Sequence, residues 1–301
     1  MSGVIQVVGV DFTSRPTRRK PIVVAHGERR GDTVRLERIA SYADASGYAR
    51  WLGEPGRWVG GFDLPFGLPR ELVESLGWPT DWLALMRHVA ALPRAALREI
   101  FAAYCAARPA GAKFARRACE APAGSSPAMK WVNPPVAYML HAGVMPLVDA
   151  GVHIAGHRAD GDPCRVALEA YPGLLARDVL GRRSYKSDER AKQTAGRRRA
   201  REELVDSLER GHARLGLRLA QDSAQRASLI DDASGRPARR RAVPARRRLG
   251  SGAAAPRLAG ARRSARRLDR RRPPMRQRIL ADTARAADGT PATRRRSNPA
   301  R

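Results

Sequence analysis

The composition of the chain changes abruptly near residue 236, and this break limits which part of the chain can fold around a core. The last 66 residues (236–301) contain 22 Arg, no Lys, three acidic residues, and no Phe, Trp, Tyr, Cys or Glu. A segment with so little apolar surface cannot offset the entropy lost when its backbone is ordered. We therefore predict one folded domain over residues 1–235 and a disordered Arg/Ala/Pro-rich tail over 236–301.

Residues 1–235 have the length and composition of an ordinary domain. They hold 35 of the 57 Lys and Arg residues and 26 of the 29 acidic ones, so the net charge of +28 comes mainly from the tail. The three cysteines form no CxxC pair, which argues against a disulfide framework and a cysteine zinc site. Because the chain opens without a signal-peptide pattern and its longest apolar stretch (134–155) is interrupted, we expect a cytoplasmic protein with no membrane partner.

The first 70 residues alternate between strand and helix patterns. Apolar, β-branched runs and one stretch of alternating apolar and charged residues predict strands. Asp44 is a suitable N-cap for a helix that runs through Leu52. Strands followed by a helix and a further strand are typical of an α/β fold. The expected strands lie at 4–10, 21–28 and 33–41, with a fourth from 58 that breaks at Pro65.

The rest of the domain is expected to be mainly helical. Apolar residues at spacings of three and four predict helices over 79–107 and 136–150. A strand is expected over 163–173, where it delivers Glu169 at its end. The charged stretch 188–219 is expected to form a surface helix. The apolar face of that helix would be formed by Leu204, Leu208 and Leu215.

Three carboxylates share one context, because each ends an apolar run just before a turn. They are Asp11 in VVGVDFTS, Asp63 in VGGFDLPFG and Glu169 in VALEAYPG. Strand ends face a crevice in α/β folds, so neighbouring strands would gather these acids. A lone acid at such a place usually caps a helix or accepts turn hydrogen bonds. Three together favour a site for Mg²⁺ or Mn²⁺, which takes a few carboxylates plus water and phosphate oxygens.

Several motifs, taken in order, resemble one bacterial family. These are GVDFTS, GFDLPFGLP, KWVNPPVAYML, and LEAYPG followed by SYKSD. Over roughly Val4 to Ser234 the chain is similar to a family catalogued as a domain of unknown function, DUF-429, whose members are predicted nucleases of the ribonuclease H-like superfamily. The resemblance implies an α/β fold with a mixed five-stranded sheet flanked by helices, beginning with three antiparallel strands.

The resemblance also implies roles for individual residues. Asp11 on the first strand and Asp63 on the fourth would be catalytic acids that hold Mg²⁺ or Mn²⁺, with Glu169 on the fifth strand as a further ligand. Nucleic acid would be the partner, cleaved by a two-metal mechanism. The polar positions that match the family and could contact phosphate are Lys130, Asn133 and Lys186.

The chain departs from the family pattern at the late helix. The family continues with an Asp-x-x-Asp-Ala helix that supplies further acids, and then with a motif like DPLEGWIV. After LIDDASG (229–235) this chain reads RPARRRAVPARRRLGSG, whereas a one-base shift of suitable codons restores GDRLDAVLCLL and then PLDGWIV. We interpret the tail as out-of-frame translation. Asp231 and Asp232 precede the missing helix and would replace its acids only in part, so we predict impaired activity and poor folding.

Two alternative functions are left open. The tail could bind nucleic acid without catalysis, since arginines neutralise phosphates, although it lacks aromatic residues that stack on bases. The DFTS segment is similar to the phosphate loop of actin-like ATPases, which suggests an ATP-dependent phosphotransferase, although Phe12 stands where glycine would let the backbone approach phosphate. The sequence does not distinguish DNA, RNA and nucleotide substrates, or decide the oligomeric state.

Overall fold

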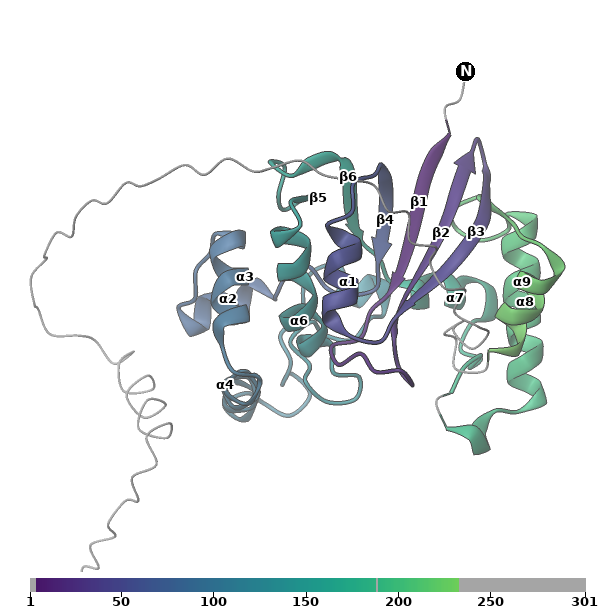
Figure 1. Ribbon diagram of the computed structural model, residues 1–301. Helices are drawn as coiled ribbons and strands as arrows, with labels where there is room; N and C mark the ends of the chain where they lie inside the picture. The colour runs from purple at the N-terminus through teal and green to yellow at the C-terminus, as the bar shows by residue number, and fades with distance from the viewer. Residues whose placement is uncertain (1–3, 188, 233–301) are drawn as a thin grey trace, which may run out of the picture. The chain divides into compact units, whose positions relative to one another are not determined.

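Seven strands form one mixed sheet in the computed structural model, which describes residues 4–187 and 189–232 (Figure 1). The tail predicted over 236–301 lies outside these residues. The α/β fold class is confirmed, and the strand order across the sheet is β5-β6-β4-β1-β2-β3-β7. The strands are β1 (Ile5–Asp11), β2 (Ile22–Arg30), β3 (Thr33–Tyr42), β4 (Trp58–Phe62), β5 (Val152–Ile154), β6 (Asp162–Glu169) and β7 (Arg218–Ala220).

The pairing of the strands changes direction at β1. The β1–β2 and β2–β3 pairs are antiparallel, whereas β4 is parallel to both β1 and β6, and β5 is parallel to β6. The expectation of three antiparallel strands at the start is confirmed. The described sheet has seven strands rather than five, because β5 and β7 extend its two edges. Each of these spans three residues, too few to produce a recognisable apolar pattern.

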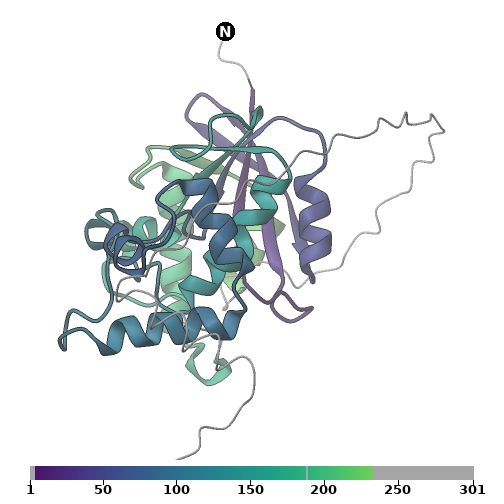
Figure 2. The ribbon, with the colours of Figure 1, turned by 90° about the vertical axis from the view of Figure 1, so that its left-hand side faces the viewer.

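Helices lie on both faces of the sheet (Figures 1 and 2). On one face, α1 and α6 pack together, with α3 against α6. The opposite face carries α8, which contacts α7, α9 and β7. The helices of the described residues are α1 (Ala45–Leu52), α2 (Arg70–Leu76), α3 (Trp82–Ala91), α4 (Arg94–Ala106), α5 (Glu120–Ala123), α6 (Val136–Asp149), α7 (Pro172–Leu180), α8 (Ala195–Arg210) and α9 (Ser223–Asp231), with a 3-10 turn at Arg190–Lys192.

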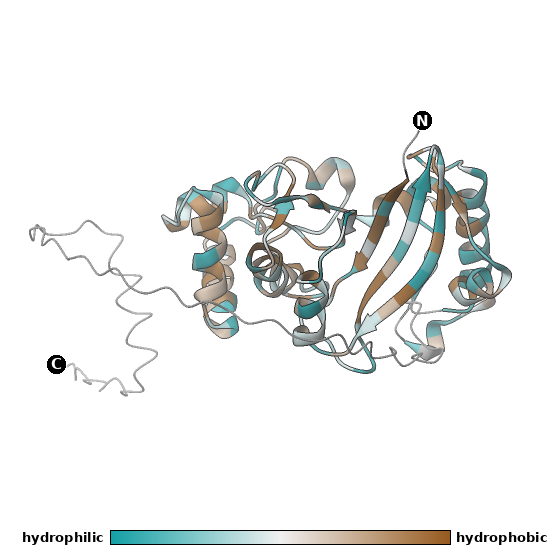
Figure 3. Cartoon of the chain, turned by 45° about the horizontal axis from the view of Figure 1, so that its top comes forward, coloured by the Kyte–Doolittle hydropathy of each residue, from teal (hydrophilic) through white to brown (hydrophobic). Residues whose placement is uncertain are grey.

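The main core lies between the sheet and the helices α1 and α6. Tyr48 and Leu52 of α1 are buried there, and Asp44 caps the helix as predicted, accepting a hydrogen bond from the Gly47 amide at 2.7 Å. Leu147 of α6 is fully buried against the same core. The hydropathy of the long strands changes along their length, as expected for strands that bury one face (Figure 3).

Gly60 of β4 leaves room for the side chains that pack on this face of the sheet. A Cβ atom at Gly60 would lie 2.6 Å from Cγ2 of Val8 and 2.8 Å from Cε2 of Phe62. Only a residue without a side chain fits here. A larger residue at position 60 would displace these side chains close to the strand ends that carry the acids.

Two predicted helices differ from the structure. The helix expected over 79–107 is divided into α3 and α4 at Pro93, which has no amide hydrogen to continue the helix. The helix expected over 188–219 is shorter, because α8 ends at Gly211 with a φ of 73°. Leu215 is 67% exposed beyond that helix, so it does not share an apolar face with Leu204. No helix in the described part of the chain is long and apolar enough to cross a membrane.

Candidate functional site

The three acids singled out in the sequence lie at the ends of three neighbouring parallel strands. Val10 is opposite Phe62, and Phe62 is opposite Glu169. The amide of Asp63 continues this ladder by donating to the carbonyl of Val10 at 2.9 Å. Asp11, Asp63 and Glu169 therefore share the edge formed by the carboxyl ends of β1, β4 and β6. Within residues 4–187 and 189–232, however, no three His, Cys, Asp or Glu side chains gather into a metal-binding group.

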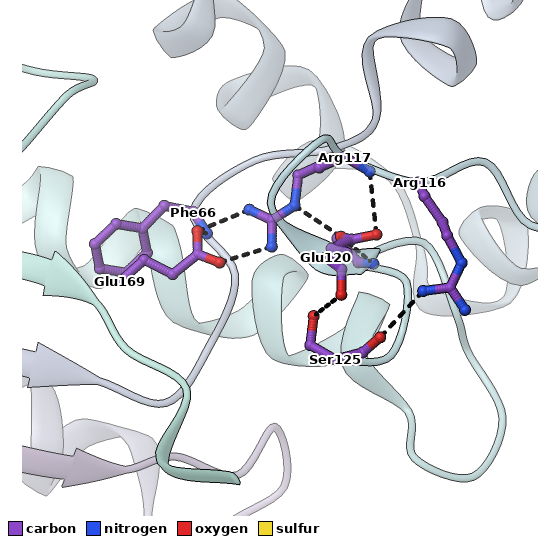
Figure 4. A network of polar contacts seen from close by, with 7 residues as sticks. Phe66, Arg116, Arg117, Glu120, Ser125 and Glu169 are labelled. Atoms are coloured by element: carbon purple, nitrogen blue, oxygen red, sulfur yellow. Dashed lines mark hydrogen bonds and ion pairs between the residues drawn. The ribbon is translucent and has the colours of Figure 1, made fainter. Parts of the chain in front are cut away.

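The carboxylate of Glu169 is held by Arg117 (Figure 4). Nη1 and Nη2 of Arg117 donate to the two carboxylate oxygens at 2.7 and 2.6 Å. The amide of Phe66, in the loop after β4, donates to Oε2 at 2.9 Å. This two-bond geometry is the strong form of an arginine–carboxylate pair. Glu169 is thus engaged by a cation of the chain itself.

A second carboxylate holds Arg117 from its other side. Glu120 has no solvent exposure and accepts hydrogen bonds from Nε of Arg117 at 2.7 Å and from the Ala128 amide at 2.9 Å. Burial opposes the charge of Arg117, but its bonds to Glu169 and Glu120 outweigh burial and raise the pKa of the guanidinium above its ordinary value. We call these three residues, Glu169, Arg117 and Glu120, the edge network.

No sequence motif singles out Arg117 or Glu120. Arg117 lies just before the four-residue helix α5, and Glu120 is its first residue. This segment has no apolar periodicity. Their one sequence signal is an arginine followed three residues later by a glutamate. This spacing is too common on exposed surfaces to identify a site. Their role depends on a partner 52 positions away, which no local pattern reveals.

His157 also lies near this edge of the sheet. It follows β5 in the chain, and its ring stacks on Trp82 with 5.2 Å between centroids and 17° between planes. Nε1 of Trp82 donates to the carbonyl of Phe66 at 2.6 Å, so the stack is joined to the loop that binds Glu169. Burial lowers the pKa of His157; the charge of Glu169 acts against this and that of Arg117 adds to it.

The loop after β1 carries positive charge beside Asp11. Nη1 of Arg94, at the start of α4, donates to Oγ of Ser14 at 3.3 Å, and its guanidinium lies 3.6 Å from the centre of the Tyr138 ring. Burial, and then the charge of Arg15, lower the pKa of Arg94. These contacts join the start of the loop to α4 and α6.

The far part of the same loop is a tight turn. The backbones of Thr17 and Lys20 bond to each other in both directions, at 3.0 and 3.1 Å, and present the two intervening residues outward. Four cations of this loop are exposed. We call them the basic loop: Arg15, Arg18, Arg19 and Lys20.

The other predicted phosphate contacts are dispersed. The carbonyl of Lys130 accepts from the Ala137 amide at 2.9 Å near the start of α6, and Asn133 is exposed in the preceding loop. Lys186 is exposed, with Nζ 5.5 Å from the Tyr185 ring centre. In the part of the chain that the structure describes, none of the three predicted residues belongs to the edge network.

The late acids lie on the other face of the sheet from α6. Asp231 is the last residue of α9, and its carboxylate is 3.0 Å from Nη2 of Arg198 on α8. The further acids that the resemblance implies fall after residue 235, outside the described residues. Comparison of the chain with protein-family models, with curated proteins and with solved structures found no match.

Proposed function

We propose that this chain is a metal-dependent phosphodiesterase of nucleic acid, with a ribonuclease H-like core related to the DUF-429 family. The observation that carries the proposal is the register of β1, β4 and β6, whose carboxyl ends bear Asp11, Asp63 and Glu169. The strand order β3-β2-β1-β4-β6 supports it, because the antiparallel strands come first and the acid-bearing strands are adjacent.

The donor set at this edge is compatible with a hard divalent cation. Mg²⁺ is commonly held by one or two protein carboxylates, with water and substrate phosphate as the other ligands. Asp11 and Asp63, on neighbouring strand ends, meet that requirement without a third acid. Glu169 is the further ligand that the resemblance implies, and in the structure its carboxylate is held by Arg117. When bound, Mg²⁺ or Mn²⁺ would activate a water molecule and stabilise the leaving oxygen.

The protein side chains account for the remaining requirements of this reaction. Asp11 and Asp63 would hold the cation at a fixed position, because the hydrogen-bonded register of β1 and β4 fixes the backbone that leads to each of them. The basic loop begins four residues after Asp11 and would contact phosphates beyond the reacting one. A polyanion several nucleotides long fits this arrangement better than a lone nucleotide does.

The two alternatives are less well supported. For an ATP-dependent phosphotransferase, Phe12 would have to leave room for phosphate, but it is 4% exposed and packs close to Gly143 of α6. Binding by the tail without catalysis depends on residues outside those described. We also retain the prediction of weak activity, since Asp231 and Asp232 precede the missing helix and would replace the late-helix acids of the family only in part.

The test is hydrolysis of end-labelled DNA and RNA with Mg²⁺ or Mn²⁺. Asp11→Asn and Asp63→Asn should each lower the rate about a hundredfold or more, because metal stabilisation of the transition state contributes several kcal/mol. Asp32→Asn, in the exposed β2–β3 turn, is the matched control. Equal activity in Asp11→Asn and wild type would refute the mechanism. Metal-independent, salt-sensitive binding without cleavage would favour the binding protein, and saturable ATP binding would favour the phosphotransferase.

A further inference from the structure

The guanidinium of Arg94 contacts two uncharged groups. It lies over the ring of Tyr138, 3.6 Å from the ring centre, which is the shortest of the cation–ring distances among the described residues. Nη1 donates to Oγ of Ser14 at 3.3 Å. A guanidinium has five N–H donors, and the Ser14 hydroxyl occupies one of them. These two contacts bring no negative charge to Arg94.

Packing of the helices holds Arg94 in this place. It is the first residue of α4, whose Leu97 is buried in the core. The Tyr138 ring belongs to α6 and is 8% exposed. From the same helix, Nε2 of His141 is hydrogen-bonded to the carbonyl of Leu92 at 2.9 Å, two residues before Arg94. The position of the guanidinium is therefore set by the core and not by solvent.

Ser14 approaches Arg94 from the loop that follows Asp11. Phe12 is 4% exposed, and a Cβ atom at Gly143 of α6 would lie 3.0 Å from its ring, so the start of the loop packs tightly on the helix. Because a hydroxyl both accepts and donates, Oγ of Ser14 can accept from Arg94 and still donate its own hydrogen to an anion. Three residues of chain reach at most about 11 Å, so Ser14 lies close to Asp11.

A second arginine acts on Arg94. Burial, and then the charge of Arg15, lower the pKa of Arg94, whereas Tyr138 acts in the opposite direction. Arg117 shows the reverse, because its two carboxylate partners outweigh burial and raise its pKa. Like charges near a half-buried position are unfavourable until an anion lies between them. Arg15 is exposed, so its side chain can turn toward such an anion.

A phosphate group is the anion that fits these three side chains. A phosphate monoester carries about two negative charges near neutral pH, which matches the two arginines. One guanidinium binds two phosphate oxygens through parallel N–H bonds. A third oxygen would then accept from the Ser14 hydroxyl or from Arg15. A carboxylate has two oxygens, and the fork of Arg94 would already occupy both.

We propose that Arg94, Ser14 and Arg15 form a phosphate-binding site that needs no metal. The site lies on the loop after β1, close to the strand end that carries Asp11. It stands on its own contacts, whereas its use to hold a phosphate of a nucleic-acid strand near the cleaved one rests on the proposed function. Arg94 and Ser14 are binding residues in this site and take no part in bond breaking.

Titration with inorganic phosphate in EDTA tests the site without metal or hydrolysis. In ¹H–¹⁵N spectra of the full chain, phosphate should shift the Nε–H signal of Arg94 until it saturates, at an ionic strength held constant with chloride. Arg94→Lys identifies this signal by its absence. The signal of Arg199, an exposed residue of α8 on the opposite face of the sheet, is the control and should not shift (Figure 1). No saturable shift at Arg94 in the wild type would overturn the proposal, whether or not any variant folds.

Substitutions separate this site from the arginine-rich tail, which every variant keeps. Followed at the Ser14 amide, Arg94→Gln should bind phosphate about tenfold or more weakly, because it loses charge-assisted hydrogen bonds. Arg94→Lys should be intermediate, since an ammonium group keeps the charge but cannot bind two oxygens in parallel. Arg199→Gln removes the same charge from α8 and should leave the affinity unchanged. Equal losses in Arg94→Gln and Arg199→Gln would mean attraction by net charge and would overturn the site.

Oligonucleotide titrations in EDTA identify the source of the phosphate. If the site holds an internal phosphodiester, a short oligothymidylate should bind at Arg94 with the same affinity with or without a 5′-phosphate. Tighter binding of the phosphorylated strand would assign the site to a terminal phosphate. If inorganic phosphate shifts Arg94 but neither strand does, the link to nucleic acid is refuted.

Failure of the proposed function gives a different result. If phosphate shifts Arg94 while Asp11→Asn cleaves nucleic acid as wild type does, the phosphate site stands and the proposed function fails. If Asp11→Asn abolishes cleavage and phosphate leaves Arg94 unshifted, the phosphate site alone is wrong.

Discussion

Arg117 binds Glu120 twice, through its backbone amide and through Nε, and so reaches both oxygens of a carboxylate that has no contact with solvent. The Ala128 amide completes the set at 2.9 Å. A buried carboxylate without such donors would be strongly unfavourable. The pair is therefore a structural element in its own right, and it fixes the position from which Arg117 extends to the strand edge.

Removing the buried carboxylate should destabilise the fold. In Glu120→Ala, Arg117 loses its buried partner and the Ala128 amide loses its acceptor, so we expect a loss of about 3–5 kcal/mol of unfolding free energy, typical of a broken buried pair. Urea denaturation measures this loss of unfolding free energy. Glu71→Ala, which removes an exposed partner of Arg108, is the control and should have little effect. Equal losses in the two variants would contradict a special role for Glu120.

A side chain at Gly143 should disturb both aspartates. Its Cβ atom would lie 2.8 Å from Cδ1 of Leu64 and 3.0 Å from Cε1 of Phe12, which directly follow Asp63 and Asp11. We expect Gly143→Ala to cost about 1–3 kcal/mol, as overpacking does, and to weaken Mn²⁺ binding.

A second helical glycine is the control for this substitution. At Gly196 in α8 the nearest atom to an added Cβ would be Oγ1 of Thr194, at 3.8 Å. Gly196→Ala should stabilise the protein slightly, by up to about 1 kcal/mol, because it reduces the entropy of the unfolded chain. If Gly143→Ala also stabilised the protein, the close packing of α6 against Phe12 and Leu64 would be refuted.

His26 should make stability depend on pH in the acid range. Burial, and then the charge of Arg38, lower its pKa from 6.5 to about 4. Between these values the unfolded chain binds a proton that the folded chain does not, so stability falls as the pH drops from 6.5 toward 4. The slope is at most about 1.4 kcal/mol per pH unit, reduced by solvent screening.

The comparison of wild type with His26→Gln isolates this contribution from the titration of the acids. Urea midpoints would be measured at several pH values across the window. The variant should lose less stability on acidification, whereas His212→Gln, which changes an exposed histidine, should keep the wild-type slope. Parallel curves for His26→Gln and wild type would exclude the proposed protonation.

The basic loop should contribute to binding of a nucleic-acid strand. In EDTA, which prevents metal-dependent cleavage, neutralising three of its cations should weaken binding of single-stranded DNA. The magnitude of the slope of log affinity against log salt concentration should decrease by up to about 2, because each phosphate contact contributes about 0.7. The variant combines Arg15→Gln, Arg18→Gln and Arg19→Gln.

Three arginines at the opposite end of β2 provide the control with the same change in charge. They lie in or beside the β2–β3 turn, far along the strand from the acids. Their neutralisation should leave the salt slope closer to that of wild type. An equal decrease in the two variants would mean that net charge, rather than the position of the basic loop, governs binding. The control combines Arg29→Gln, Arg30→Gln and Arg35→Gln.

The interpretation of the tail makes a prediction about the gene. Resequencing across the codons for Ser234 to Arg241 should find an extra base relative to the frame that encodes a late helix. The repaired protein should then unfold cooperatively and show stronger metal-dependent hydrolysis. An unbroken frame would mean that the cell makes the arginine-rich tail, and nucleic-acid binding by the tail would become the leading function.

The sequence by itself determined the features that depend on neighbouring residues. Apolar runs located β1 and β2, and the alternation of apolar and charged residues located β3. Asp44 located the start of α1, and the position of each acid after a run placed Asp11, Asp63 and Glu169 at strand ends. The composition predicts the boundary between the domain and the tail. These features are local, because a strand alternates its faces and a helix cap bonds within three residues.

Only the tertiary structure decided what the acids contact. Arg117 reaches Glu169 across 52 positions of sequence, and His157 reaches Trp82 across 75. The short strands β5 and β7 likewise exist because a neighbouring strand offers hydrogen bonds to them. Ion pairs, ring stacks and edge strands form between segments distant in sequence, and their partners carry no shared periodicity. The fold brings them together, and no local pattern encodes the pairing.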